Sequence, residues 1–293
     1  MARNQSRKTI MKKSLIAIPV VAALGLTGCA ATESITVGSQ SYYSNEIIAE
    51  IYAQALEENG FEVERRYAIG QREAYVPALE AGEVDLFPEY TGNLLQYYNP
   101  DATATAADEV YSALQSALPE NLTALAMSPA TDQDSYNVTR EFAEAEGISS
   151  LADLAGVSGL VLGGNPELEE RPYGPQGLLN TYGAEVGFEA TGDLTFEALV
   201  EGEINMANIY SGDPRIAQFD LVTLADPEGM FLSSNVVPIA NSAIADDVAN
   251  VINAVSVAMS PQELVELNNR SQQEQLSSAD IANDWLVSEG LKQ

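Results

Sequence analysis

Histidine is absent from this sequence, and cysteine occurs once, as Cys29, in 293 residues. Histidine is the commonest metal ligand and general base in proteins, and cysteine is a common catalytic nucleophile. The sequence also contains no P-loop and no GxGxxG, GxSxG or HExxH motif. We therefore expect a protein that is not an enzyme and that uses no cofactor and no metal.

Basic residues are scarce as well, because 13 Lys and Arg stand against 43 Asp and Glu and the net charge is −30. Nucleic-acid binders and proteins that adhere to anionic membranes need basic patches, so this balance excludes both classes. Apolar residues make up 46% of the chain, which is enough to bury one large core or two smaller ones.

The N-terminal segment differs in charge from the rest of the chain. Basic residues precede the apolar run "SLIAIPVVAALGLTG", and no acidic residue occurs before it ends. This pattern predicts a secretory signal peptide over residues 1–28, because the run is too short for a comfortable membrane span. The run ends in "LTGCA", which resembles the lipobox of bacterial lipoproteins, whereas the alternative is an idle or buried Cys29 after an ordinary signal peptide.

A lipidated Cys29 predicts where the mature protein is located. Residues 29–34 would form a lipid-anchored linker, and the protein would be extracytoplasmic, on the outer face of the bacterial cell membrane. The lipid would be its only contact with the membrane.

Short apolar runs alternate with helical patterns along the mature chain. Residues 35–39 and 84–87 read as buried strands, residues 61–69 read as an alternating strand, and residues 44–60 read as a helix capped by Ser44. This βαβ rhythm predicts mostly parallel sheets covered by helices on both faces. Residues 246–259, 261–271 and 278–290 then read as three consecutive helices without a strand.

Residues 78–92 and 198–212 align with each other without a gap, as "ALEAGEVDLFPEYTG" and "ALVEGEINMANIYSG". Tyr90 and Tyr210 fall at the same place, after a short strand. Ligands of open α/β sheets bind outside the carboxyl ends of the strands, so the pair predicts facing walls of one cleft. The alternative is that each tyrosine only closes the end of its own sheet.

Several segments carry a family resemblance, above all "GEVDLFPEYTG", with "DQDSYNV", "LEERPYGPQGLLNTYG" and "NIYSGDPRIAQFDLVTLADPEGMF". They resemble the substrate-binding lipoproteins of ABC importers for quaternary amines such as glycine betaine, choline, carnitine and proline betaine. The resemblance implies an α/β, two-lobed type II periplasmic-binding-protein fold, in which each lobe is a mostly parallel sheet flanked by helices. Lobe 1 would comprise residues 35–130 and 238–293, lobe 2 residues 131–237, with crossovers near 128–133 and 232–240 and the ligand cleft between the lobes.

The resemblance also implies a cage of aromatic side chains around the cation. A quaternary ammonium has no N–H to donate, whereas aromatic faces attract it by about 0.5–2 kcal/mol each. By position, the implied ligand contacts are the walls Tyr90, Tyr136 and Tyr210, the acid Asp134, the neighbouring Asn93, and Arg171 for a ligand carboxylate. For Arg171 the alternative is a surface salt bridge.

Two positions depart from the family pattern, because Ser234 stands where a fourth tyrosine is expected and Gln40 where a lysine is common. One explanation is that Tyr42, Tyr43 or Tyr173 supplies the missing wall. Another is a site enlarged for a bulkier betaine such as carnitine or ergothioneine, with Ser234 and Gln40 bonding its polar groups. A third is a ligand outside the quaternary amines. We favour a trimethylammonium betaine.

The function that follows is transport without catalysis. A monomeric binding protein would close around its ligand and deliver it to an ABC permease and its ATPase. A carboxylate-dependent surface hydrolase using Glu89, and a sensory protein that presents its ligand to a receptor kinase, are the alternatives.

Overall fold

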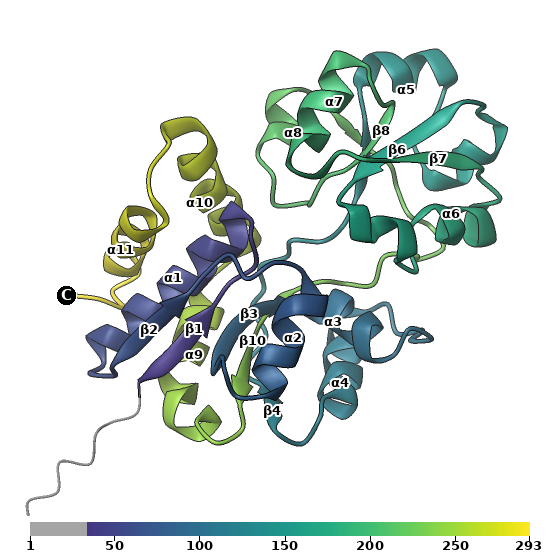
Figure 1. Ribbon diagram of the computed structural model, residues 1–293. Coiled ribbons are helices and arrows are strands. Elements are labelled where there is room, and N and C mark those ends of the chain that lie inside the picture. The colour runs from purple at the N-terminus through teal and green to yellow at the C-terminus, as the bar shows by residue number, and fades with distance from the viewer. Residues whose placement is uncertain (1–33) are drawn as a thin grey trace, which may run out of the picture. The chain divides into compact units, whose positions relative to one another are not determined.

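The computed structural model describes residues 34–293 (Figure 1). The predicted signal peptide, Cys29 and the predicted linker up to residue 33 lie outside the described residues. Within residues 34–293, no helix has both the length and the apolar surface needed to cross a bilayer.

The first sheet has five strands in the order β2-β1-β3-β10-β4. Its strands are β1 (Ile35–Gly38), β2 (Val63–Arg66), β3 (Leu86–Tyr90), β4 (Leu122–Ala124) and β10 (Val236–Asn241). Strand β1 runs parallel to β2 and β3, whereas β10 runs antiparallel to β3 and β4. A chain segment from late in the sequence therefore completes a sheet that is built mostly from its beginning.

Helices cover both faces of this sheet, as the two separate apolar clusters show (Figure 1). One face packs against α1 (Tyr43–Glu58), α9 (Ala245–Ala258), α10 (Pro261–Glu274) and α11 (Ser278–Ser288). The other packs against α2 (Arg72–Glu80), α3 (Thr91–Tyr98) and α4 (Ala107–Ala117). The three consecutive C-terminal helices predicted from the sequence are present, and α10 begins at a Ser260–Glu263 capping box.

The second sheet repeats the first, with five strands in the order β7-β6-β8-β5-β9. Its strands are β5 (Tyr136–Val138), β6 (Leu160–Gly164), β7 (Val186–Ala190), β8 (Met206–Asn208) and β9 (Val222–Thr223). The α-helices around it are α5 (Arg140–Glu146), α6 (Pro175–Tyr182), α7 (Thr195–Glu201) and α8 (Arg215–Gln218), and the 3-10 turns are η1 (Leu151–Gly156), η2 (Pro166–Glu170) and η3 (Gly192–Leu194). The predicted α/β architecture of two helix-flanked sheets is confirmed.

The internal repeat of the sequence corresponds to a repeat of topology. Strands β3 and β8, which end the two similar segments, each occupy the third position of their sheet. Each pairs in parallel with the strand before it in the sheet order and antiparallel with the strand after it. Similar sequences therefore form equivalent strands.

Two segments connect the sheets and lie side by side. Thr131 forms a bridge with Asn235, Val236 N donates to Ala130 O (2.9 Å), and Asp132 N donates to Ser234 O (3.2 Å). Strand β10 already begins at Val236, two residues before the position at which the chain is predicted to return to lobe 1, residue 238. The predicted lobe limits stay a prediction.

Two local predictions differ from the structure. Ser44 does not cap α1 but lies in its first turn, where its hydroxyl donates to Asp132 Oδ2 (3.2 Å). The strand predicted over residues 84–87 does not end at Phe87 but continues as β3 to Tyr90, with Pro88 opposite Pro238 in β10. The Pro88 carbonyl accepts from Asn45 Nδ2, and the Pro238 carbonyl accepts from Leu125 N. Neither carbonyl needs an N–H from the opposite proline, so the hydrogen bonds between β3 and β10 are not interrupted.

Candidate functional site

Side chains from the strands, helices and loops around both sheets line one cavity that opens to solvent. Residues before the first crossover segment contribute Gln40, Tyr42, Gln71, Arg72, Tyr90 and Asn93. That crossover segment and the residues after it contribute Asp132, Asp134, Asn165, Glu167, Leu168, Arg171, Tyr173, Asn208 and Tyr210. The cavity is therefore rich in tyrosines, amides and carboxylates.

Four of the lining residues are tyrosines, namely Tyr42, Tyr90, Tyr173 and Tyr210. The Tyr42 hydroxyl donates to the Tyr90 hydroxyl (2.6 Å), and the ring centroids of Tyr42 and Tyr210 lie 5.4 Å apart. Burial raises the pKa of all four hydroxyls, so they stay protonated and neutral at physiological pH. These rings offer a cation neutral aromatic faces.

Tyr90 reaches the cavity because β3 passes directly into α3 without a loop. The glycine two positions later makes this junction possible. A Cβ added to Gly92 would lie 2.8 Å from the Leu232 and Ser233 carbonyl oxygens and from Ser234 Oγ. Only glycine allows the second crossover segment to approach the junction so closely, which explains the Tyr-Thr-Gly pattern physically.

Asn93 connects both parts of the cavity. Its Nδ2 donates to Asp134 Oδ2 (2.6 Å) and to the Tyr173 hydroxyl (3.0 Å), and its Oδ1 accepts from Ser234 Oγ (2.6 Å). Asp134 accepts a further hydrogen bond from Asn208 Nδ2 (3.0 Å). This network fixes the Asp134 carboxylate at the wall of the cavity.

Both arginines of the cavity are paired with glutamates. Arg72 holds Glu89 with two hydrogen bonds of 2.8 Å, and Glu89 also accepts from Tyr75 OH and Tyr90 N. Burial opposes the charge of Arg72, but the charge and hydrogen bonds of Glu89 outweigh it and raise the pKa of the guanidinium. Arg171 contacts Glu73 through Nη1 (2.8 Å) and Nη2 (3.2 Å).

Asp132 has no basic partner among these residues. It is 3% exposed and accepts from Ser44 Oγ (3.2 Å) and Gly212 N (3.0 Å). Burial, with smaller contributions from Asp213 and Asp134, raises the pKa of its carboxyl to about 7. An ionised Asp132 is therefore costly when the cavity holds no cation.

Comparison with known proteins identifies the family of this chain. Residues 33–288 match the OpuAC model, described as the substrate binding domain of ABC-type glycine betaine transport system. The chain belongs to the OpuAC family.

Relatives and solved structures agree with this assignment. The chain is 25% identical over 280 residues to glycine betaine-binding protein YehZ of Escherichia coli, covering 89% of this chain and 92% of that protein. It is 25% identical over 284 residues to a glycine-betaine-binding protein of Pseudomonas aeruginosa, covering 90% and 91%. A solved glycine betaine/carnitine/choline ABC transporter protein has a TM-score of 0.72 at 21% identity, covering 88% of this chain and 99% of that one, which supports the shared fold.

A further relative matches over only part of its length. An ergothioneine transport permease/ergothioneine binding protein, EgtU of Helicobacter pylori, is 25% identical over 205 residues, covering 67% of this chain and 36% of that protein.

The OpuAC-family cavity includes most, but not all, of the residues predicted from the sequence. It brings together Tyr90, Asn93, Asp134, Arg171, Tyr210, Gln40, Tyr42 and Tyr173. Both tyrosines of the internal repeat thus line one cavity, and Tyr42 and Tyr173 lie in it as two further walls. Their contact with a ligand stays a prediction.

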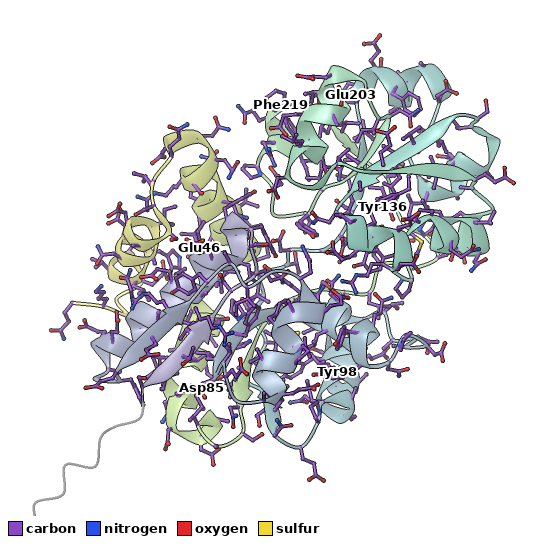
Figure 2. The ribbon with its side chains drawn as sticks, in the orientation of Figure 1. Glu46, Asp85, Tyr98, Tyr136, Glu203 and Phe219 are labelled. Atoms are coloured by element: carbon purple, nitrogen blue, oxygen red, sulfur yellow. The ribbon has the colours of Figure 1, made fainter. Side chains whose placement is uncertain are left out.

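Three predicted residues do not line this cavity. Tyr136 belongs to the second sheet (Figure 2) and is fully buried. Its hydroxyl donates to the Tyr173 carbonyl, and its ring packs edge-on against Phe231, with 5.1 Å between the ring centroids. Ser234 lies behind Asn93 and orients it. Tyr43 lines an adjoining cavity with Phe196 and Arg215. In this structure, these three residues support or adjoin the site.

Sequence reasoning missed Gln71, Arg72, Asp132, Asn165, Glu167 and Asn208. Two of them had a signal in the sequence, because Asp132 opens the "DQDSY" motif and Asn208 lies two residues before Tyr210 in the repeated segment. The others depend on pairings that only the fold makes, such as that of Arg72 with Glu89.

Proposed function

We propose that this OpuAC-family chain is the solute-binding protein of an ABC importer and captures a quaternary ammonium compound such as glycine betaine, choline or carnitine. The observation that carries the proposal is the set of four neutral tyrosines around one cavity that also contains Asp132 and Asp134. Aromatic faces and carboxylates attract a cation that has no N–H to donate.

The mechanism we propose is ligand-dependent closure. Tyr42 and Tyr90 come from the first sheet and its helices, whereas Asp134 and Tyr210 come from the second. A ligand that contacts both groups favours the arrangement in which they are close over one in which they are apart. That arrangement would dock on the permease, and the ATPase would drive import.

We further propose that the protein is monomeric, extracytoplasmic and lipid-anchored through Cys29, after removal of residues 1–28. The "LTGCA" sequence supports the anchor. No catalytic step is assigned to the chain. Glu89, the residue considered for a hydrolase, is fully buried and bound by Arg72 and Tyr75, which leaves it no access to a substrate.

A bulkier ligand such as ergothioneine is the second candidate. An adjoining cavity shares Tyr42, Asp132, Asn165, Asn208 and Tyr210 with the first and contains about 1120 Å³ of empty space. A longer ligand held by the shared residues would extend into that space. The relative of Helicobacter pylori named for ergothioneine binding makes this compound a necessary member of any ligand panel.

Calorimetric titration tests the proposal directly. We expect the purified protein to bind at least one of glycine betaine, choline, carnitine, proline betaine and ergothioneine. Replacing Tyr90 or Tyr210 by alanine removes one aromatic face, so each change should weaken binding about 3- to 30-fold.

The matched control is Tyr98→Ala. Tyr98 lies at the end of α3, bonds Glu80 and lines neither cavity, so this variant should bind like the unmodified protein (Figure 2). No binding of any of the five compounds would refute the proposed function. Unchanged affinity in Tyr90→Ala and Tyr210→Ala would refute the aromatic recognition.

A further inference from the structure

The charged groups of the cavity do not balance. Its charged side chains are Arg72, Asp132, Asp134, Glu167 and Arg171. A cavity made for a zwitterion such as a betaine needs a cationic group free to receive the ligand carboxylate. The partners of the two arginines therefore decide which net charge the cavity accepts.

Arg72 is not free to bind a ligand. Its guanidinium forms a two-toothed pair with Glu89, and the two side chains are 8% and 0% exposed. Separating such a buried pair would leave Glu89 charged and unpaired in the interior, which is strongly unfavourable. Arg72 and Glu89 thus act as a neutral unit in the wall.

Arg171 is also occupied, by a different kind of pair. Its two terminal nitrogens contact both oxygens of Glu73, and this pair joins α2 to the loop that follows η2. Burial acts to raise the pKa of Glu73, but hydrogen bonds from its own backbone and from Arg171 outweigh it and lower the pKa. A ligand carboxylate would have to compete with a carboxylate that is already in place.

Asp132 and Asp134 have no basic partner in the cavity. They accept hydrogen bonds only from neutral donors, which are Ser44, Gly212, Asn93 and Asn208. The ion pairs found among residues 34–293 include neither of them. With both arginines paired with glutamates, Asp132 and Asp134 are acids without a basic partner beside the tyrosines, and Glu167 is a third such acid in the cavity wall.

We propose that this cavity selects a cation over a zwitterion, so that its ligand is a quaternary ammonium alcohol of net charge +1, and that Asp132 and Asp134 exclude ligands bearing a carboxylate. A positive ligand matches these unpaired acids, whereas a betaine would bring a further carboxylate close to them. The amides of Gln40, Gln71 and Asn165 also line the cavity and can both donate to and accept from a hydroxyl. The inference rests on the proposed function and narrows it to one charge class.

The test compares choline with glycine betaine by calorimetry at low salt and pH 8. We expect choline to bind about tenfold more tightly or better, because repulsion between like charges is strong in a buried site. Asp132→Asn and Asp134→Asn should each weaken choline binding about tenfold and betaine binding less. The dissociation constants of the two ligands should therefore differ by a smaller factor than in the unmodified protein.

Two further variants make the test specific. Asp101→Asn removes the same charge from an exposed loop and should leave the ratio unchanged. Glu73→Gln frees Arg171 and should improve betaine binding relative to choline. Thermal unfolding of every variant shows whether it is folded. Because the two aspartates are replaced in separate variants, the test still works if one of these variants does not fold.

The outcomes separate the inference from the proposed function. Betaine binding as tight as choline binding, or tighter, overturns the charge selection and leaves the quaternary-amine function intact. An unchanged ratio in both aspartate variants also overturns it. Failure of both ligands and of the other quaternary amines to bind refutes the proposed function, and the inference with it.

Discussion

At the scale of single residues, Asp132 shows how a binding group can reduce stability. Its carboxyl is buried beside Asp134 and Asp213, and its pKa is raised to about 7. The folded protein therefore binds more protons than the unfolded chain between about pH 4 and pH 7, where an unperturbed aspartate is ionised. The free energy of unfolding falls across this window as the pH rises, and the destabilisation by the ionised Asp132 carboxylate is complete above pH 7.

Asp132→Asn should remove this cost. Asparagine keeps the size of the side chain and an oxygen that can accept from Gly212 N. Without ligand, we expect the variant to exceed the unmodified protein in stability at pH 8 by on the order of 2–4 kcal/mol, with the difference vanishing toward pH 4. Urea unfolding at several pH values measures it. A variant that is no more stable at pH 8 would show that the ionised carboxylate carries no penalty.

At the scale of elements, the loop that joins η2 to α6 determines much of the cavity. It carries Arg171 and Tyr173, and it follows Leu168 of η2. Its course depends on Gly174 within it and on Gly177 in the first turn of α6. A Cβ added to Gly174 would lie 2.1 Å from the Leu168 carbonyl oxygen, and one added to Gly177 would lie 2.0 Å from that of Pro172. Because both neighbours are backbone atoms, the loop itself would have to move to admit a side chain.

Gly177→Ala should therefore weaken both stability and binding. We expect a loss of about 1–3 kcal/mol in unfolding free energy and a clear loss of ligand affinity, because Arg171 and Tyr173 shift with the loop. Gly156→Ala is the matched control, since an added Cβ there has no atom within 4 Å and should change stability by less than about 0.5 kcal/mol. Equal behaviour of the two variants in chemical unfolding and calorimetry would contradict this role of the loop.

The elements also show which parts of the site sequence can predict. The repeated segments predicted that Tyr90 and Tyr210 share a cavity, because equivalent strand ends lie at equivalent positions in similar sheets. Sequence did not distinguish Tyr42 from Tyr43, or Tyr173 from Tyr136, because the direction of each ring depends on the backbone where an element begins or ends. Tyr42 precedes α1 and lines the cavity, whereas Tyr43, the first residue of the helix, lines the adjoining one.

Charge pairing was the least predictable feature. Arg72 and Glu89 are 17 residues apart, and Glu73 and Arg171 are 98 residues apart. No local pattern indicates such partners, so the sequence predicted Arg171 as a ligand contact, with a surface salt bridge as the alternative. Arg171 forms a salt bridge with Glu73, and this pairing is one ground for our proposal of a cationic ligand instead of a betaine.

At the scale of the whole described chain, two sheets of the same strand order each contribute part of one binding cavity. The crossover segments that join them also supply Asp132, which lines the cavity, and Ser234, which orients Asn93. The central claim at this scale is that the combined surface recognises an ammonium group by its methyl groups and its charge, without a hydrogen bond to nitrogen.

Choline and ethanolamine test that claim most directly, because they share charge and hydroxyl and differ in the three N-methyl groups. Calorimetric titration of the unmodified protein with each compound should show ethanolamine binding about tenfold more weakly than choline or worse, since its strongly hydrated ammonium gains less from aromatic faces. Ethanolamine binding as tight as choline binding would contradict recognition by the four tyrosines.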